Sequence, residues 1–443
     1  MAELEPLYTA EEMRAAEAGH DVDAMMQRAG AAVAEELARR FPDAQRIALH
    51  AGGGANGGDG RIAADILQAH GRELVDERPD VIIDALLGTG LRGEPREETS
   101  RLIEQINGAG VPVLAVDVPS GIDASSGEVA GAAVRADVTV TMHGPKVGLA
   151  VGPGRFHAGE VPVADIGLAA EETSARLVTE EILLRVPRKQ ERDNKYSAGS
   201  VLVVGGSRGM TGAAALAARA AFRGDAGYVA IAAPSESLPT LETLVLEAVK
   251  RPLEQAFEAT ERATALAIGP GLGRGEEAKA LVRRLLEETD VPAVVDADAL
   301  HELEPFERSA PTVLTPHSGE LGRLIGEESS WVDAHRLEAL ARAVERFGCV
   351  VLLKGADTLV GAPGEGVLVR AVNDAGLATA GTGDVLTGIT AAFLSKGLDA
   401  RIAAAAAATA HGLAASLAPQ RRGLVASDVV EALPLALARH GGD

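Results

Sequence analysis

Short apolar runs alternate with stretches of helical spacing along the first 150 residues. Between residues 10 and 40, Met13, Ala16, Val33 and Leu37 belong to a set of apolar positions spaced as on one or two helices. The apolar runs that we expect to be strands are Arg46–His50, Val81–Leu87, Val111–Val116 and Val138–Thr141. Strands that alternate with helices predict a parallel sheet with helices on both faces.

The same alternation starts again after a charged stretch at residues 170–195. Expected strands are the runs SVLVV and YVAIAA, followed by Ala265–Ile268, Ala293–Val295 and Val350–Leu353. An Ala-rich helix is expected over residues 211–223, and two or three helices from Gly383 to about Arg439. We therefore predict two α/β domains, residues 1–180 and 188–443, each of ordinary domain size.

Composition narrows the range of functions. The chain has 443 residues and a formal charge of −22, which argues against nucleic acid and against an anionic membrane surface as partners. The single cysteine, Cys349, excludes an internal disulfide framework. The acidic N-terminus has no apolar signal-peptide core and no membrane-length apolar run is present, so we expect a cytoplasmic protein.

A glycine-rich loop follows the first apolar run. Residues 52–60 read GGGANGGDG and contain the spacing G-x-G-x-x-G, with a helix expected from Arg61 to His70. Glycines let a backbone approach a pyrophosphate, and the helix N-terminus offers free N–H groups. A tight turn between strand and helix would explain the same glycines, so this motif alone is weak evidence.

Oxygen-bearing side chains gather where these strands end. Asp84 and Asp117 lie at the carboxyl ends of their runs, and Asn56 and Ser120 follow two of them. The carboxyl ends of parallel strands line one crevice, and hard cations prefer oxygen ligands, so an ion is plausible there. Each Asp taken singly could instead cap a helix or a turn. Lys146 either reaches this crevice or is a solvated loop lysine.

The motifs GGGANGGDG, DALLGTGLRGE, AVDVPSGIDASSGEV and TVTMHGPKVGL closely resemble, in this order, the epimerase domain of the NAD(P)H-hydrate repair proteins. The resemblance implies a Rossmann-like αβα domain in which Asp117 touches the substrate as acid or base. It further implies a potassium ion held by Asn56, Asp84 and Ser120. The implied contacts to the hydrated dinucleotide are Ala55, Asn56, Gly57, Gly58, Asp59, Gly88, Thr89, Gly90, Leu91, Arg92, Gly93, Glu94 and Lys146. The stretch from His70 to Val81 is shorter than this family usually has, which affects the sheet edge.

The sharpest motif of the second half is ATAGTGDVLTG, residues 378–388. A Gly-Thr-Gly turn opens into an apolar helix, so its N–H groups form an anion hole. Asp384 in the first turn can take a proton from a hydroxyl that attacks a phosphate. It could instead only cap the helix. No Walker A motif is present, which excludes a P-loop kinase.

Other polar residues follow the strands of this half. They are the loop GPGLGRG at 269–275, Asp296 and Asp298, the run Thr315-Pro316-His317 with Glu320, and Lys354-Gly355-Ala356-Asp357-Thr358. The last segment can bracket the phosphates or ribose of a nucleotide. On its own, His317 is equally consistent with a ligand contact and with a surface histidine.

In this order, IGPGLG, VVDADAL, LTPHSGEL, LLKGADTLV and ATAGTGDVLTGI resemble the NAD(P)H-hydrate dehydratase branch of the ribokinase-like αβα fold. The resemblance implies nucleotide contacts at Lys354, Gly355, Ala356, Asp357, Thr358 and Gly383. It implies contacts to the hydrated cofactor at Ala214, Gly271, His317 and Asp384. Together the two resemblances cover the chain from about residue 7 to 435.

The resemblances imply a two-step repair enzyme for hydrated NADH and NADPH (NADHX and NADPHX). One domain would interconvert the R and S forms at C6, and the other would use ADP, or ATP, with Mg²⁺ to dehydrate the S form. We expect a homo-oligomer with small-molecule substrates only. Two alternatives stay open: a kinase of thiamine or pyridoxal precursors, and a non-catalytic binding module like the related domain of an RNA-decapping scaffold.

Overall fold

The computed structural model describes residues 3–169, 171–371, 374–420 and 422–439, and it divides the chain into two compact units. The N-terminal unit comprises Pro6–Arg176 with the short segment Asp333–Arg336. The C-terminal unit comprises residues 3–5, Leu177–Val332 and the chain from Leu337 onwards. The predicted outer domain limits, residues 1 and 443, lie outside the described residues.

The N-terminal unit contains a parallel six-stranded sheet in the order β3-β2-β4-β5-β6-β7. Its strands are β2 (Arg46–Ala51), β3 (Glu73–Leu74), β4 (Val81–Ala85), β5 (Val113–Val116), β6 (Val138–Met142) and β7 (Val163–Ala164). The predicted parallel sheet is confirmed here. The shortened stretch between His70 and Val81 contributes the edge strand β3, which has only two residues, both exposed.

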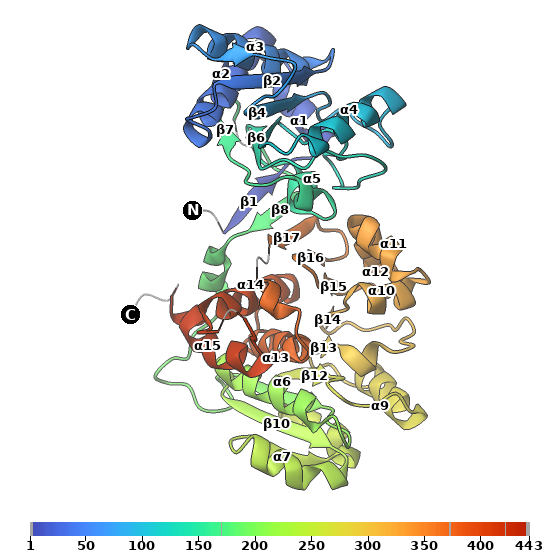
Figure 1. The fold of residues 1–443 in the computed structure, drawn as a ribbon. Helices are drawn as coiled ribbons and strands as arrows, with labels where there is room; N and C mark the ends of the chain where they lie inside the picture. Colours follow the sequence, from blue (N-terminus) through green and yellow to red (C-terminus); the bar gives the residue numbers. More distant parts are fainter. Residues whose placement is uncertain (1–2, 170, 372–373, 421, 440–443) are drawn as a thin grey trace. The chain divides into compact units, whose positions relative to one another are not determined.

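Helices cover both faces of this sheet, as expected from the alternation (Figure 1). Helices α2 (Val22–Arg40) and α3 (Ala55–Ala69) bury Val33, Leu37 and Leu67 against one face. Helix α4 (Glu97–Gly108) buries Ile103 and Ile106 against the other. Helix α1 (Ala10–Glu17) begins at a Thr9–Glu12 capping box.

The predicted start of the helix after the glycine loop was wrong. Helix α3 begins at Ala55 instead of Arg61, so residues 55–60 of the expected loop 52–60 are helical. Glycine usually indicates a loop, but here the glycines are needed for close packing of the helix. A Cβ on Gly57 would lie 2.0 Å from the carbonyl oxygen of Gly52. A Cβ on Gly60 would lie 2.6 Å from the Cβ of Ala85. Helix and strand therefore approach each other more closely than larger residues allow.

An 11-stranded sheet has the order β1-β8-β17-β16-β15-β14-β13-β12-β9-β10-β11; strands β9 to β17 belong to the C-terminal unit, whereas β1 and β8 each contain residues of both units. Its central strands are β9 (Ser200–Val204), β10 (Tyr228–Ala233), β12 (Ala265–Ile268), β13 (Ala293–Val295), β14 (Thr312–Leu314) and β15 (Val350–Leu353), all parallel. Strands β16 (Asp357–Gly361) and β17 (Val367–Ala371) are antiparallel and were not expected from the sequence. The remaining strands are β1 (Leu4–Leu7), β8 (Ala175–Val178) and β11 (Val249–Pro252).

Helices α6 (Thr211–Arg223), α13 (Thr382–Ser395), α14 (Ala400–Leu417) and α15 (Ala426–Ala438) pack together on one face of this sheet (Figure 1). Helices α9 (Glu276–Glu287), α10 (Ser318–Ile325) and α12 (Arg336–Phe347) lie on the other side. A Cβ on Gly388 of α13 would lie 2.1 Å from the Ala217 oxygen of α6, so small residues permit this packing. Among the described helices, none combines the length and the apolar character that a bilayer crossing requires.

Candidate functional site

A cavity of about 620 Å³ opens in the N-terminal unit at the carboxyl ends of β2, β4 and β5. Ten residues predicted from the sequence line it: Ala55, Asn56, Asp59, Gly88, Thr89, Gly90, Leu91, Arg92, Glu94 and Asp117. Its other walls include Met25, Met26, Met142 and Ile166, which offer apolar surface. Predicted residues Gly57, Gly58, Gly93 and Lys146 are not among those that line it.

The residues predicted to hold a cation lie together beneath this cavity. Asp84 is fully buried, and its carboxylate accepts hydrogen bonds from the Ser120 hydroxyl (2.6 Å) and backbone N–H (2.8 Å). Burial raises the pKa of Asp84 to about 6. The Asn56 Nδ2 donates a hydrogen bond to the Leu87 carbonyl, but the Asn56 Oδ1 is buried without a partner among the described residues. An unpaired buried oxygen beside a carboxylate and a hydroxyl fits a monovalent cation.

Asp117 follows β5 in a left-handed backbone conformation with φ of 64°. Its Oδ1 accepts hydrogen bonds from the Met142 N–H (3.0 Å) and the Thr141 hydroxyl (3.2 Å), and from the Lys146 ammonium. Lys146 is fully buried, so the alternative of a solvated loop lysine is wrong. A strained residue held by three donors on one oxygen is typical of a functional carboxylate whose other oxygen is free to act.

Besides Asp117 and Glu94, two further carboxyl groups line this cavity, those of Asp59 and Glu17. Burial, and then the charges of Asp117 and Glu17, raise the pKa of Asp59 to about 7. Its Oδ1 is buried without a partner in the part of the chain that the structure describes. Glu17, the last residue of α1, was not predicted, because nothing in its local sequence separates it from the solvent-facing acids of that helix.

The C-terminal site forms around the start of α13. Gly381, with φ of +91°, is the N-cap residue, and no side chain caps this helix. The alternative that Asp384 only caps the helix is therefore wrong. Its carboxyl group stands free beside the open N–H groups of the first turn, as an anion hole requires.

Buried charges surround Asp384. Lys354 is bonded to Asp296 (2.7 Å) and lies 3.8 Å from a Glu320 oxygen. The Thr387 hydroxyl of α13 donates to the second oxygen of Asp296 (2.6 Å). Burial, and then the negative charge of Asp296, raise the pKa of Asp384 to about 7, while Lys354 acts in the opposite direction. A carboxyl group with this pKa is suited to proton transfer near neutrality.

The loop at 269–275 is tied to the end of β13. Asp298 accepts a hydrogen bond from the Gly273 N–H (3.0 Å) and pairs with Arg274 (2.8 Å). The carbonyl of Gly271 accepts from the Ser207 N–H (2.7 Å) and hydroxyl (2.9 Å). This predicted contact residue is thus part of a rigid rim of backbone at the strand ends.

The remaining predicted residues have different surroundings. Ala214 is completely buried within the core of the unit. His317 caps α10, accepting a hydrogen bond from the Gly319 N–H (3.0 Å), while its side chain is 56% exposed. Asp357 and Thr358 are buried in β16, whereas Lys354, Gly355 and Ala356 form the turn before it. A Cβ on Gly383 would lie 3.4 Å from the Lys354 ammonium, so these two residues adjoin.

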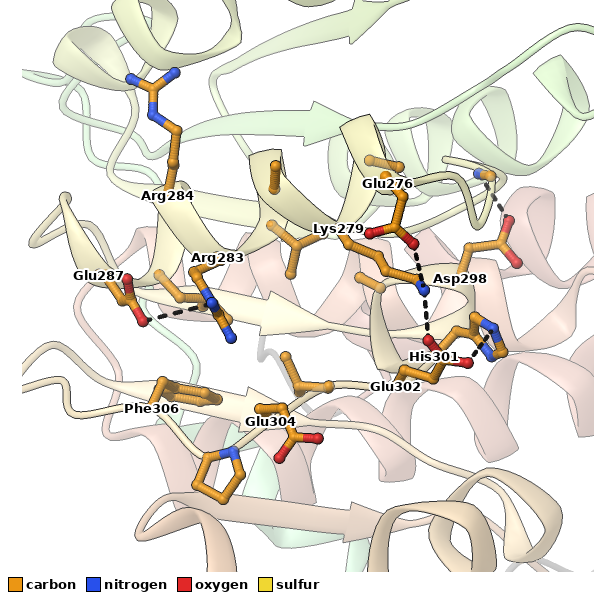
Figure 2. A pocket seen from close by; sticks show the side chains of 18 residues that line it. Glu276, Lys279, Arg283, Arg284, Glu287, Asp298, His301, Glu302, Glu304 and Phe306 are labelled. Atoms are coloured by element: carbon orange, nitrogen blue, oxygen red, sulfur yellow. Dashed lines mark hydrogen bonds and ion pairs between the residues drawn. The ribbon is translucent and has the colours of Figure 1, made fainter.

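A second hollow of about 380 Å³ lies along α9 in the C-terminal unit (Figure 2). Its charged side chains pair with one another: Lys279 bonds Glu276 and contacts Glu302, and Arg283 lies 3.9 Å from Glu287. Gly273 and Asp298, which the sequence singled out, line it, but none of the residues with an implied ligand contact does. Other charged side chains of this hollow pair with residues outside it, Asp298 with Arg274 and Arg284 with Glu288.

Comparisons with known proteins agree with this division. The family model described as NAD(P)H-hydrate dehydratase matches residues 201–435. The model described as YjeF-related protein N-terminus matches residues 22–77 and 68–148. The two matches overlap at residues 68–77, at the shortened stretch before Val81.

Similar curated proteins carry both parts. The chain is 40% identical over 398 residues to the bifunctional NAD(P)H-hydrate repair enzyme Nnr of Salinibacter ruber, covering 83% of this chain and 73% of that protein. It is 34% identical over 456 residues to the enzyme of that name from Escherichia coli, covering 92% and 88%.

Solved structures match the C-terminal part. The ADP/ATP-dependent NAD(P)H-hydrate dehydratase of Bacillus subtilis, co-crystallised with ATP and Mg²⁺, superposes with a TM-score of 0.55 at 29% identity, over 59% of this chain and 97% of that one. A ribokinase-like superfamily protein from Enterococcus faecalis has a TM-score of 0.54 at 24% identity, over 61% and 98%. The second likeness concerns the fold alone, and it confirms the predicted ribokinase-like architecture.

Proposed function

The chain belongs to the family of bifunctional NAD(P)H-hydrate repair enzymes, and from this premise we propose that each of its two units carries one of the two repair steps. Residues 1–180 epimerise hydrated NADH and NADPH at C6. Residues 188–443 dehydrate the S form with a nucleotide. The observation that carries the proposal is that one chain holds a cavity lined by Asp117 in one unit and, in the other, the carboxyl group of Asp384 in the first turn of a helix whose N-cap residue is a glycine.

The N-terminal cavity suits a dinucleotide with a polar, non-aromatic ring. The first turn of α3 and the loop at 88–94 contribute backbone N–H groups and Arg92 for phosphates and ribose. The methionines of the wall supply apolar surface for the ring. Asn56, Asp84 and Ser120 would hold a potassium ion, whose charge supports bound phosphates.

The C-terminal site suits phosphoryl transfer to a hydroxyl group. Asp384 takes the hydroxyl proton as the oxygen attacks the terminal phosphorus of ADP or ATP, and the α13 N–H groups stabilise the transferred charge. Phosphate then leaves C6 with its ester oxygen and C5 loses a proton, which together restore the 5,6 double bond of the ring. Lys354 and the turn at 355–356 contact the nucleotide, and Mg²⁺ bound to its phosphates supplies further positive charge there. The support is the raised pKa of Asp384 and the uncapped helix start.

The test follows the absorbance of NADH as it returns from hydrated NADH. The S form is supplied with ADP and with ATP in separate reactions, and then an R/S mixture is supplied. We expect complete recovery from the mixture with one donor, and none with Asp384→Ala.

Recovery limited to the S half of the mixture would remove the epimerase from the proposal. A stable phosphorylated product from a thiamine precursor, without NADH recovery, would favour the kinase alternative instead. We add the homo-oligomeric state and the cytoplasmic location as proposals, which size-exclusion chromatography and cell fractionation test directly.

A further inference from the structure

Glu17 brings an unexplained carboxyl group into the N-terminal cavity. It ends α1, is half-buried, and lines the cavity together with Asp59 and Asp117. Within the described residues its carboxyl group accepts no hydrogen bond and pairs with no cation. A half-buried carboxyl group without partners is costly unless it carries a proton or faces a ligand.

Glu17 and Asp117 have opposite environments. Asp117 accepts three hydrogen bonds on one oxygen, and the Lys146 ammonium neutralises its charge. Burial, and then the charge of Asp117, raise the pKa of Glu17, against a smaller effect of Lys146. Two carboxyl groups in one pocket whose surroundings differ in this way can divide the work: one serves as the base and the other as the acid.

We infer that Glu17 is the proton donor of the epimerisation, acting on the nitrogen of the hydrated ring while Asp117 acts on its hydroxyl group. This inference rests on the proposed epimerase function. It assigns a role to a residue outside the glycine-rich and strand-end motifs.

The chemistry follows from the substrate carbon. C6 bears a hydroxyl group and the ring nitrogen N1, so it is a hemiaminal. The Asp117 carboxylate removes the hydroxyl proton, the C6–O electrons form a carbonyl, the C6–N1 bond breaks, and Glu17 protonates N1. Without an acid N1 would leave as an anion, which makes the proton donor necessary.

Ring closure returns both groups to their starting states. Rotation about C5–C6 turns the other face of the aldehyde toward N1. N1 attacks C6, Glu17 takes back the N1 proton, and Asp117 returns its proton to the oxygen. The product is the other epimer, no co-reactant is consumed, and the net charge of the pocket is unchanged.

The experiment uses the full chain with R-NADHX and no nucleotide, so that only epimerisation is observed, by chromatographic separation of the epimers. The test variant is Glu17→Gln, which keeps the size of the side chain but cannot act as an acid. Glu11→Gln is the matched control, because Glu11 is exposed on the same helix. Dehydration of S-NADHX with nucleotide, measured on each variant, checks the C-terminal unit, and thermal unfolding of each variant checks that the N-terminal unit is folded.

We expect Glu17→Gln to lower kcat for epimerisation by about 10²–10⁴-fold with little change in KM. Glu17→Asp should recover part of this loss, and Glu11→Gln should behave as wild type. The wild-type rate should fall on the alkaline side as Glu17 loses its proton, and Glu17→Gln should lack this fall. The charged groups that face Glu17 are Asp59, Asp117 and Lys146, with Arg92, Glu94 and Arg96 elsewhere on the cavity wall, so Asp59→Asn is measured alongside to assign the fall.

Wild-type kcat in Glu17→Gln would overturn the inference, as would a loss confined to KM or a loss that Glu17→Asp does not relieve at all. A wild-type chain that epimerises nothing would instead overturn the epimerase proposal, and this inference with it. The two failures are therefore distinguishable.

Discussion

At the scale of single residues, Asp384 shows how burial prepares a carboxyl group for its task. Its pKa of about 7 means that it is protonated in acid and ionised in weak base. Because only the ionised form can accept a hydroxyl proton, we expect the dehydration rate to rise with pH through about 7. Asp384→Asn should lower kcat by about 10²–10⁴-fold, and the remaining activity should not depend on pH. NADH absorbance measures both, and a wild-type rate that is flat across this range would contradict the assignment.

The same shift has a cost in stability. The folded pKa of about 7 exceeds the value near 3.9 of an unfolded aspartate. The folded state thus binds the proton more tightly, and stability falls as pH rises from about 4 through 7. We expect Asp384→Asn to be more stable than wild type by about 1–3 kcal/mol at pH 8 and equal to it near pH 4. Glu247→Gln, an exposed carboxyl-to-amide change in the same unit, should alter neither value.

The orphan oxygen of Asn56 leads to a prediction for ion binding. If Asn56, Asp84 and Ser120 hold potassium, the ion stabilises the folded chain by mass action, by about 2.7 kcal/mol at a hundredfold excess over Kd. We expect potassium chloride to raise Tm above its value in tetramethylammonium chloride of equal ionic strength. The difference should vanish in Asn56→Ala. Equal Tm values of the wild type in the two salts would remove potassium from the proposal.

Sequence reasoning found Asn56, Asp84, Asp117 and Ser120 because each follows an apolar run, and parallel strands bring such positions to one edge. It could not find Glu17, since α1 is distant in sequence and only tertiary packing carries its end to the cavity. The Lys354–Asp296 bond was likewise hidden, although both residues stood out individually. Partnerships between segments depend on strand order, which local patterns do not contain.

At the scale of elements, apolar runs located most strands to within two residues. Ala265–Ile268, Ala293–Val295 and Val350–Leu353 were predicted with the bounds the structure has. The missed β16 begins with Asp357 directly after a Lys-Gly-Ala turn, a sequence that reads as a loop. The hairpin forms because β15 pairs with β16 and β16 with β17, which buries Asp357 and Thr358. Pairing with neighbours overrode the local signal.

Two glycines at the start of α3 can be tested as a matched pair: Gly57 in the helix and Gly53 just before it. In Gly57→Ala the new Cβ would lie 2.0 Å from a backbone oxygen that cannot move aside, whereas a Cβ on Gly53 would meet nothing within 4 Å. Alanine favours helix formation, so a loss at Gly57 would come from the clash alone. We expect Gly57→Ala to destabilise by about 1–3 kcal/mol and to reduce epimerisation, with Gly53→Ala close to wild type. Thermal unfolding measures the first effect, and equal Tm values for the two variants would contradict the close approach.

At the scale of the whole molecule, the charge of −22 contrasts with ligands that are themselves anions. In both sites, helix N-termini, glycine-rich backbone and one lysine supply local positive charge; Lys146 is buried and Lys354 is partly buried. Distant acidic residues are screened at physiological salt, beyond about 8 Å. An acidic surface and an anion-binding function are therefore compatible.

Each site is also complete within its own unit. Within the described residues, the groups that donate to the Asp117 carboxylate come from residues 141–146, and Lys354, Asp296 and Thr387 around Asp384 belong to the C-terminal unit. The two steps should therefore work when the active sites are on different molecules. We expect neither Asp117→Ala nor Asp384→Ala alone to restore all NADH from an R/S mixture, and an equal mixture of the two variants to restore it fully.

The time course of that mixture carries more information than its endpoint. The S form made on one molecule has to diffuse to another, so recovery of the R half should slow as the protein is diluted, while recovery of the S half should scale only with enzyme amount. Asp117→Ala alone supplies the control for spontaneous epimerisation, because it dehydrates the S form without converting the R form. If the mixture recovered only the S half, one active site would depend on an unaltered second site in the same chain. The division of the reaction between two self-contained units would then be wrong.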